Sequence, residues 1–156
     1  MLDTLKAINE TAAFNRWAGF EVTRASEGEA ELRMRWRADD MGQYAGFLHA
    51  GLIGALLDTA CGFAAATVAG RVLASHFSVN CIAPAVGREF IASGHVVKAG
   101  RKQVFASAEL HALGDAGAGQ EGGQRKLVAT GQAILVPVAQ APEPARPEGA
   151  KKDAII

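Results

Sequence analysis

Hydrophobic and polar positions alternate in several short segments of the chain and give way to one long apolar run. From Ala50 to Ala66 the only polar side chains are Asp58 and Thr59. A helix over residues 49–68 would be apolar on every face, which is typical of a helix that is buried in a core or spans a membrane. We expect a core helix and no membrane span, because an aspartate at mid-helix costs at least about 2.5 kcal/mol on insertion.

The segments around this helix have the period of two that is typical of half-buried strands. Two strands before the helix form a hairpin around the turn pair Glu27 and Gly28, and Gly70 ends the helix. A short amphipathic helix opens the chain, and residues 38–48, which have no period, form a loop. The expected strands cover residues 20–26, 30–36, 73–83, 89–98, 103–110 and 126–136. This order predicts an α+β fold in which an antiparallel sheet of about six strands wraps around one long helix.

The length of 156 residues suits one domain, which we place at residues 1–138. A glycine-rich loop over 114–123 separates the last two strands. Residues 139–156 are rich in proline, alanine, glutamate and lysine, and we expect them to form a disordered tail.

The net charge and the cysteine and histidine content indicate which ligands and partners are not expected. Sixteen basic and sixteen acidic residues cancel, so no overall field attracts nucleic acid or an anionic membrane. The two cysteines lie in apolar surroundings, and the histidines lack ligand spacing, so we predict no metal site and no cofactor. The first ten residues carry acids and lack the features of a signal peptide, so we expect a cytoplasmic protein.

The position of Asp58 in the apolar helix constrains any chemistry there. At a rise of about 1.5 Å per residue, Asp58 lies roughly 12 Å along the axis from the first free amides near Ala50 and Gly51. One helix therefore cannot offer both groups to the same small substrate atom. If both groups act together, two copies of the helix must meet.

The residues at the helix start also resemble a known signature. Leu48–Gly51, with Asp58 nine residues after His49, resembles the motif of hotdog-fold acyl-CoA thioesterases of the phenylacetic-acid-degradation (PaaI-like) type. That family has a His-Gly-Gly helix start and an aspartate at this offset, and the resemblance covers residues 14–136. It implies a homodimer with two sheets side by side, often paired again into a tetramer, with two sites at the dimer interface.

The resemblance also implies the roles of the site residues. In the family the helix-start amide polarises the thioester carbonyl, and the aspartate of the partner subunit acts as base or nucleophile. We assign the first role to the amides of Ala50 and Gly51 and the second to Asp58, because helix-start amides suit an oxyanion and a desolvated aspartate is a stronger base. Two residues depart from the family pattern: Ala50 stands where glycine is usual, and Gln43 stands where asparagine is frequent.

Further candidates surround these groups, each with a simpler alternative. Gln43 either helps to hold the thioester or the water, or is a plain loop residue. His49 either contacts substrate or, as we favour, has a structural role in which the imidazole bonds a backbone carbonyl or braces the preceding loop. Ser75 is a possible water-holding hydroxyl on a strand. Arg101 and Lys102 either grip the nucleotide phosphates of coenzyme A or form a solvated hairpin tip.

These residues predict hydrolysis of acyl-CoA thioesters, with an aryl-acetyl or medium-chain acyl group, by a homo-oligomer. A non-catalytic acyl-CoA binding module is the alternative, and the presence of Asp58 argues against it. A hotdog dehydratase or hydratase would need a histidine paired with an acid on the long helix. No histidine follows His49 in the helix, so this alternative ranks lower.

Overall fold

The computed structural model describes residues 1–114 and 124–139. The predicted glycine-rich loop from residue 115 onward and the predicted tail from residue 140 onward lie outside the described residues. The elements are, in chain order, α1 (Leu2–Thr11), α2 (Ala13–Ala18), β1 (Glu21–Ser26), β2 (Glu29–Arg35), α3 (Ala38–Met41), α4 (Ala50–Ala69), β3 (Val72–Cys81), β4 (Glu89–Ala99), β5 (Val104–Leu113) and β6 (Arg125–Pro137).

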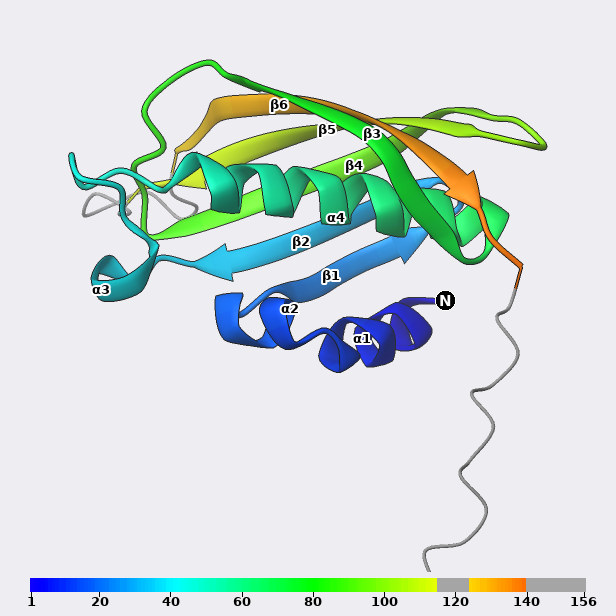
Figure 1. Ribbon diagram of the computed structural model, residues 1–156. Helices are drawn as coiled ribbons and strands as arrows, with labels where there is room; N and C mark the ends of the chain where they lie inside the picture. Colours follow the sequence, from blue (N-terminus) through cyan, green and yellow to red (C-terminus); the bar gives the residue numbers. More distant parts are fainter. Residues whose placement is uncertain (115–123, 140–156) are drawn as a thin grey trace, which may run out of the picture.

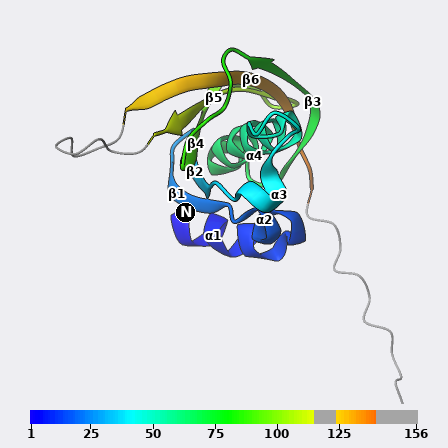
Figure 2. The same cartoon turned by 90° about the vertical axis from the view of Figure 1, so that its left-hand side faces the viewer.

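One antiparallel sheet of six strands curves around α4 (Figure 1). The strand order is β1-β2-β4-β5-β6-β3, so the strand that follows α4 in sequence lies at the end of the sheet opposite to β1. Viewed from the end, the strands form an arch with α4 inside it, and α1 and α2 lie beside β1 (Figure 2). The predicted α+β architecture, with six antiparallel strands around one long helix, is confirmed.

A row of small residues brings α4 close to the sheet. Across the inner face Ala30 pairs with Gly94, Gly94 with Ala108, and Ala108 with Gly131. A Cβ atom added to Gly94 would overlap the carbonyl oxygen of Ala60 in α4, and one added to Gly131 would lie 3.2 Å from the Cβ of Leu57. The backbone of α4 therefore lies in a groove that larger side chains would fill.

The helix α4 supplies the centre of the hydrophobic core. Its length and composition would also suit a membrane span, but half of its most apolar window is buried within the fold. The helix has a core role here because the sheet covers it. The buried residues of α4 are Leu52, Ile53, Gly54, Leu56, Leu57, Ala60, Cys61, Ala64 and Ala65.

Two short helices were not predicted. Helix α2 has six residues and ends at Gly19, which takes a left-handed conformation with φ of 72°. Helix α3 occupies the start of the segment predicted as a loop over residues 38–48, and its last residue, Met41, is buried. Helices this short contain too few residues to show a hydrophobic period, and tertiary contacts stabilise them rather than intrinsic propensity.

The two edges of the sheet differ. β1 has six residues, includes Glu21 and Arg24, and packs against α1. β3 has ten residues, includes no Asp, Glu, Lys or Arg, and leaves Leu73 and Phe77 exposed. Long edge strands without charges are open to pairing with another chain, because their outer N–H and C=O groups lack partners within the sheet.

The close packing of α4 on the sheet predicts that a side chain at Gly94 lowers the stability of the fold. We expect Gly94→Ala to lower the free energy of unfolding by about 2 kcal/mol or more, because the added methyl overlaps helix backbone that cannot move without disturbing the core. Gly114→Ala is the control, since nothing lies within 4 Å of its added Cβ atom. Urea denaturation measures both, and equal stability of the two variants would contradict the close packing.

Candidate functional site

The start of α4 is capped by the residue that precedes the helix. His49 has the extended conformation of an N-cap, with φ of −62° and ψ of 135°, and its Nδ1 accepts a hydrogen bond of 2.9 Å from the Gly51 amide. The amides of Leu52 and Ile53 donate to the His49 carbonyl at 2.9 and 3.2 Å. The Ala50 amide is the first one in the helix and has no acceptor among the described residues.

This capping changes one of the sequence assignments. We predicted free amides at both Ala50 and Gly51, but the Gly51 amide is occupied by the His49 imidazole. The reason is local, since an N-cap side chain satisfies amides that the helix itself leaves without partners. Of the two amides, only that of Ala50 is left without an acceptor among the described residues. The His49 imidazole therefore caps the helix by accepting from an amide, and in the part of the chain that the structure describes it does not make the carbonyl contact that we considered. An accepting Nδ1 places the proton of the neutral ring on Nε2.

The loop before α4 is tied together by backbone hydrogen bonds. The His49 amide donates to the Met41 carbonyl at 3.0 Å, and the Leu48 amide donates to the Ala85 carbonyl at 3.1 Å. The Gln43 amide donates to the Phe47 carbonyl at 2.8 Å, and the Gln43 side-chain oxygen accepts from the Ala45 amide. In the single chain Gln43 therefore stabilises its own loop, which is the simpler of the two roles considered for it.

Asp58 lies in the middle of α4, beside the neighbouring strands β6 and β3. Its side chain is partly buried, and Oδ1 is shielded from solvent without a hydrogen-bond partner among the described residues. Burial raises the pKa of the Asp58 carboxyl above its ordinary value. The adjoining space is too narrow for a water molecule in the single chain, and it is lined by Leu57, Asp58, Cys61, Phe77, Ser78, Gly131, Gln132 and Ala133.

Cys61 and Phe77 are among the lining residues that the sequence analysis did not assign to the site. Cys61 follows Asp58 by one helical turn, so the helical period was a signal that could have found it. Burial, with a smaller contribution from the Asp58 charge, raises the pKa of Cys61 to about 12. Cys61 is therefore a neutral thiol near pH 7 and a poor nucleophile. Phe77 is contributed by β3, and only the tertiary fold brings it to Asp58.

The other candidates lie apart from this group. The Ser75 hydroxyl donates to the Ile134 carbonyl at 3.2 Å, next to a bulge in β3. Arg101 and Lys102 are exposed in the turn between β4 and β5, toward the end of α4 that is opposite to Ala50 (Figure 1). The structure thus does not bring the two cations to the helix start of the same protomer.

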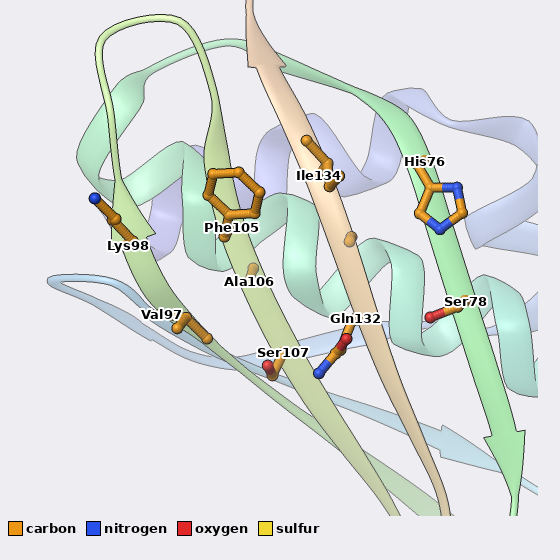
Figure 3. A pocket seen from close by; sticks show the side chains of 10 residues that line it. His76, Ser78, Val97, Lys98, Phe105, Ala106, Ser107, Gln132 and Ile134 are labelled. Atoms are coloured by element: carbon orange, nitrogen blue, oxygen red, sulfur yellow. The ribbon is translucent and has the colours of Figure 1, made fainter.

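A larger cavity lies on the opposite face of the sheet from α4. It has a volume of about 540 Å³, and the side chains of Phe105, Ile134 and Gln132 project into it from neighbouring strands, while α4 lies behind the sheet (Figure 3). It contains none of the predicted site residues and no carboxylate. Across residues 1–114 and 124–139, no group of three or more His, Cys, Asp or Glu residues is placed to hold a metal ion.

Comparison with known proteins identifies the family. The family model described as thioesterase superfamily matches residues 45–118, which include the start of α4, Asp58 and three strands. A thioesterase family protein from Silicibacter pomeroyi is 31% identical, with a TM-score of 0.77, and the match covers 85% of this chain and 93% of that one. The chain belongs to the thioesterase superfamily. Its architecture is therefore the predicted hotdog fold, and membership supports thioester hydrolysis as the general activity.

More distant structures share the fold of this thioesterase-superfamily protein. Zebrafish thioesterase superfamily member 2 is 23% identical, with a TM-score of 0.72, and the match covers 88% of this chain and 99% of that one. The E. coli PaaI protein from the phenylacetic acid degradation operon is 21% identical, with a TM-score of 0.73 and coverage of 85% and 89%. At these identities the likeness shows the fold, so the PaaI-like type remains a prediction. A search of curated proteins gave no significant match.

Burial of Asp58 predicts a pH-dependent stability. A carboxyl whose pKa is higher in the folded state holds its proton more tightly when the protein is folded. Its protonation therefore stabilises the fold at low pH, and this stabilisation is lost as pH rises from the ordinary pKa of about 3.8 through the folded pKa. Asp58→Asn should therefore raise the melting temperature at pH 7, and the gain should vanish below pH 3.8, where the carboxyl is neutral in both states. Thermal melts across pH measure this, with the exposed Asp39→Asn as control. A lower melting temperature at pH 7 would show that the carboxylate has a stabilising partner.

Proposed function

We propose that this protein hydrolyses acyl-CoA thioesters to the free acid and coenzyme A, in a site that two copies of the chain share. The observation that carries the proposal is Asp58, on the central helix of a thioesterase-superfamily fold: its Oδ1 is shielded from solvent and has no hydrogen-bond partner within residues 1–114 and 124–139. Shielding a carboxylate oxygen from water without a hydrogen-bond partner is unfavourable, so its presence favours a chemical role over a structural one.

The chemistry requires a base and an oxyanion donor. Asp58 takes a proton from water, the resulting hydroxide adds to the thioester carbonyl, and the Ala50 amide with the helix dipole stabilises the oxyanion. Collapse of this intermediate breaks the carbon–sulfur bond, and the proton passes to the leaving thiolate. Direct attack by Asp58, followed by hydrolysis of the anhydride, uses the same two groups. Neither route requires a metal or a cofactor beyond coenzyme A.

Two copies are required because the two groups lie on one helix. Ala50 and Asp58 belong to the same continuous α4, so their separation along the axis is roughly 12 Å. Asp58 lies beside β3, and β3 is the uncharged edge of the sheet. Pairing of two β3 edges would place the α4 helices side by side and antiparallel, which brings Asp58 of one copy toward Ala50 of the other.

The same arrangement suggests how coenzyme A is held. The β4–β5 turn with Arg101 and Lys102 lies toward the C-terminal end of α4, which in an antiparallel pair faces the helix start of the second copy (Figure 1). The two cations would then lie near the site where the partner binds the thioester, and they would pair with phosphates. The apolar residues of α4 suit an aryl-acetyl or medium-chain acyl group, in line with the PaaI-like resemblance.

Replacement of Asp58 tests the reaction. In a thiol-release assay across a panel of acyl-CoA substrates, we expect Asp58→Asn to lower kcat by about a hundredfold or more, because the carboxamide is not a base. The exposed Asp39→Asn should retain wild-type turnover. A folded Asp58→Asn variant with full turnover would contradict the role of Asp58. Saturable binding of acyl-CoA without thiol release by the wild type would instead favour a binding module.

Replacement of Ala50 tests the shared site. Ala50→Pro removes the proposed donor amide, and proline is favoured at the first helical position, where the extended His49 also suits a following proline. This variant alone should lose activity, whereas Ala50→Gly should retain it.

Mixing the two inactive variants then decides whether the site is shared. When Ala50→Pro and Asp58→Asn chains reassociate at random, about half of the dimers are mixed and each has one intact site, so about a quarter of wild-type activity should return. No recovery in verified mixed dimers would show that the two groups do not act across the interface.

A further inference from the structure

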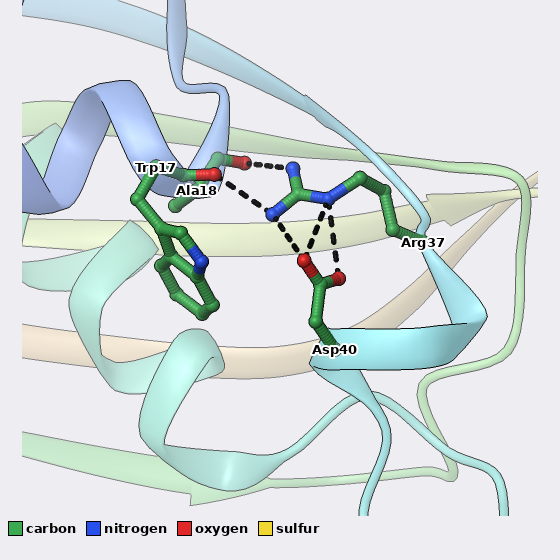
Figure 4. A network of polar contacts seen from close by, with 4 residues as sticks. All are labelled: Trp17, Ala18, Arg37 and Asp40. Atoms are coloured by element: carbon green, nitrogen blue, oxygen red, sulfur yellow. Dashed lines mark hydrogen bonds and ion pairs between the residues drawn. The ribbon is translucent and has the colours of Figure 1, made fainter.

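Arg37 joins three parts of the chain that are separate in sequence. It follows β2, occupies the N-cap of α3, and extends its guanidinium toward the end of α2 (Figure 4). Its Nη2 donates to the Trp17 carbonyl at 2.7 Å, and its Nη1 donates to the Ala18 carbonyl at 3.3 Å. Nε and Nη2 also contact the Asp40 carboxylate at 3.1 to 3.2 Å.

These contacts satisfy groups that α2 leaves without partners. At the end of α2 the Gly19 amide donates to the Arg16 carbonyl, and the Phe20 amide donates to the Asn15 carbonyl. The next two carbonyls, of Trp17 and Ala18, are those that the guanidinium reaches. The negative end of the helix dipole favours a cation there, and the guanidinium also lies 5.6 Å from the centre of the Trp17 ring.

The same residue leads to the start of α4. The Met41 amide, at the end of α3, donates to the Arg37 carbonyl at 3.2 Å, and the Met41 carbonyl accepts from the His49 amide at 3.0 Å. His49 caps the helix whose first amide belongs to Ala50. A single turn of helix is not stable by itself, so α3 depends on Arg37 and on the burial of Met41 for its position.

We propose that Arg37 is a positioning residue for the oxyanion donor: by holding α3 against the end of α2, it sets the orientation of the α4 start and thus of the Ala50 amide. This role rests on the proposed function. It requires a guanidinium, because one planar group must reach two carbonyls and a carboxylate together, whereas the ammonium of lysine is a single point charge.

The test compares Arg37 variants with Arg35→Ala. Arg35 is a matched control because it lies two residues earlier on β2, is more exposed, and forms one ion pair at 3.7 Å with Glu89. We expect Arg37→Ala to lower kcat roughly tenfold with KM changed less than twofold, since a small displacement of a catalytic donor has an effect of this size. Arg37→Lys should be intermediate, and Arg35→Ala should match wild type.

Hydrogen exchange measured by mass spectrometry gives a readout that does not depend on activity. Arg37→Ala should accelerate exchange in peptides covering residues 41–50 while peptides from β4 and β5 keep wild-type rates. Wild-type kcat, wild-type exchange in this segment, or faster exchange throughout the chain would each overturn the positioning role. If Asp58→Asn retains full turnover, the proposed reaction fails, and the exchange data still decide whether Arg37 holds the helix start.

Discussion

The close approach of α4 to the sheet is the constraint on which the rest of the structure depends. It requires small residues at four successive positions across the inner face, and Gly94 tolerates no side chain because the Ala60 carbonyl occupies that space. The sheet can then curve around the helix and bury more than one of its faces. This geometry accounts for the apolar residues of α4 that face the groove, because their side chains are removed from water.

The burial of α4 also gives Asp58 its chemical character. The same packing that covers Leu57 and Cys61 removes water from the Asp58 carboxyl and raises its pKa. The carboxylate therefore reduces the stability of the fold near neutral pH while becoming a stronger base. Such an opposition between stability and reactivity is usual at sites where a strained or desolvated group does chemistry. Cys61, in the same setting, stays protonated and contributes bulk rather than reactivity.

The two edges of the sheet, β1 and β3, have different surroundings and different proposed roles. At β1 the N-terminal helices cover the sheet, and Arg37 links their end to α3 and so to the start of α4. At β3 the edge is long and carries no Asp, Glu, Lys or Arg, and Asp58 lies beside it. In the proposed dimer the first edge orients the oxyanion donor and the second brings in the base of the other copy. A site assembled in this way depends on contacts far from the reacting atoms.

The sequence by itself determined the elements whose signal is local. The period of two predicted the six strands, the apolar run predicted α4, and Gly70 predicted its end. Each of these signals is local, because it depends only on residues that are close together in the sequence. The helix-start motif with Asp58 led to the hotdog fold, which the comparisons confirm. Only the tertiary structure decided that the His49 imidazole occupies the Gly51 amide, that Phe77 lies beside Asp58, and that Arg37 joins α2 to α3. Side-chain direction and contacts between distant segments depend on how the elements pack, and periodicity along the chain carries no information about that packing.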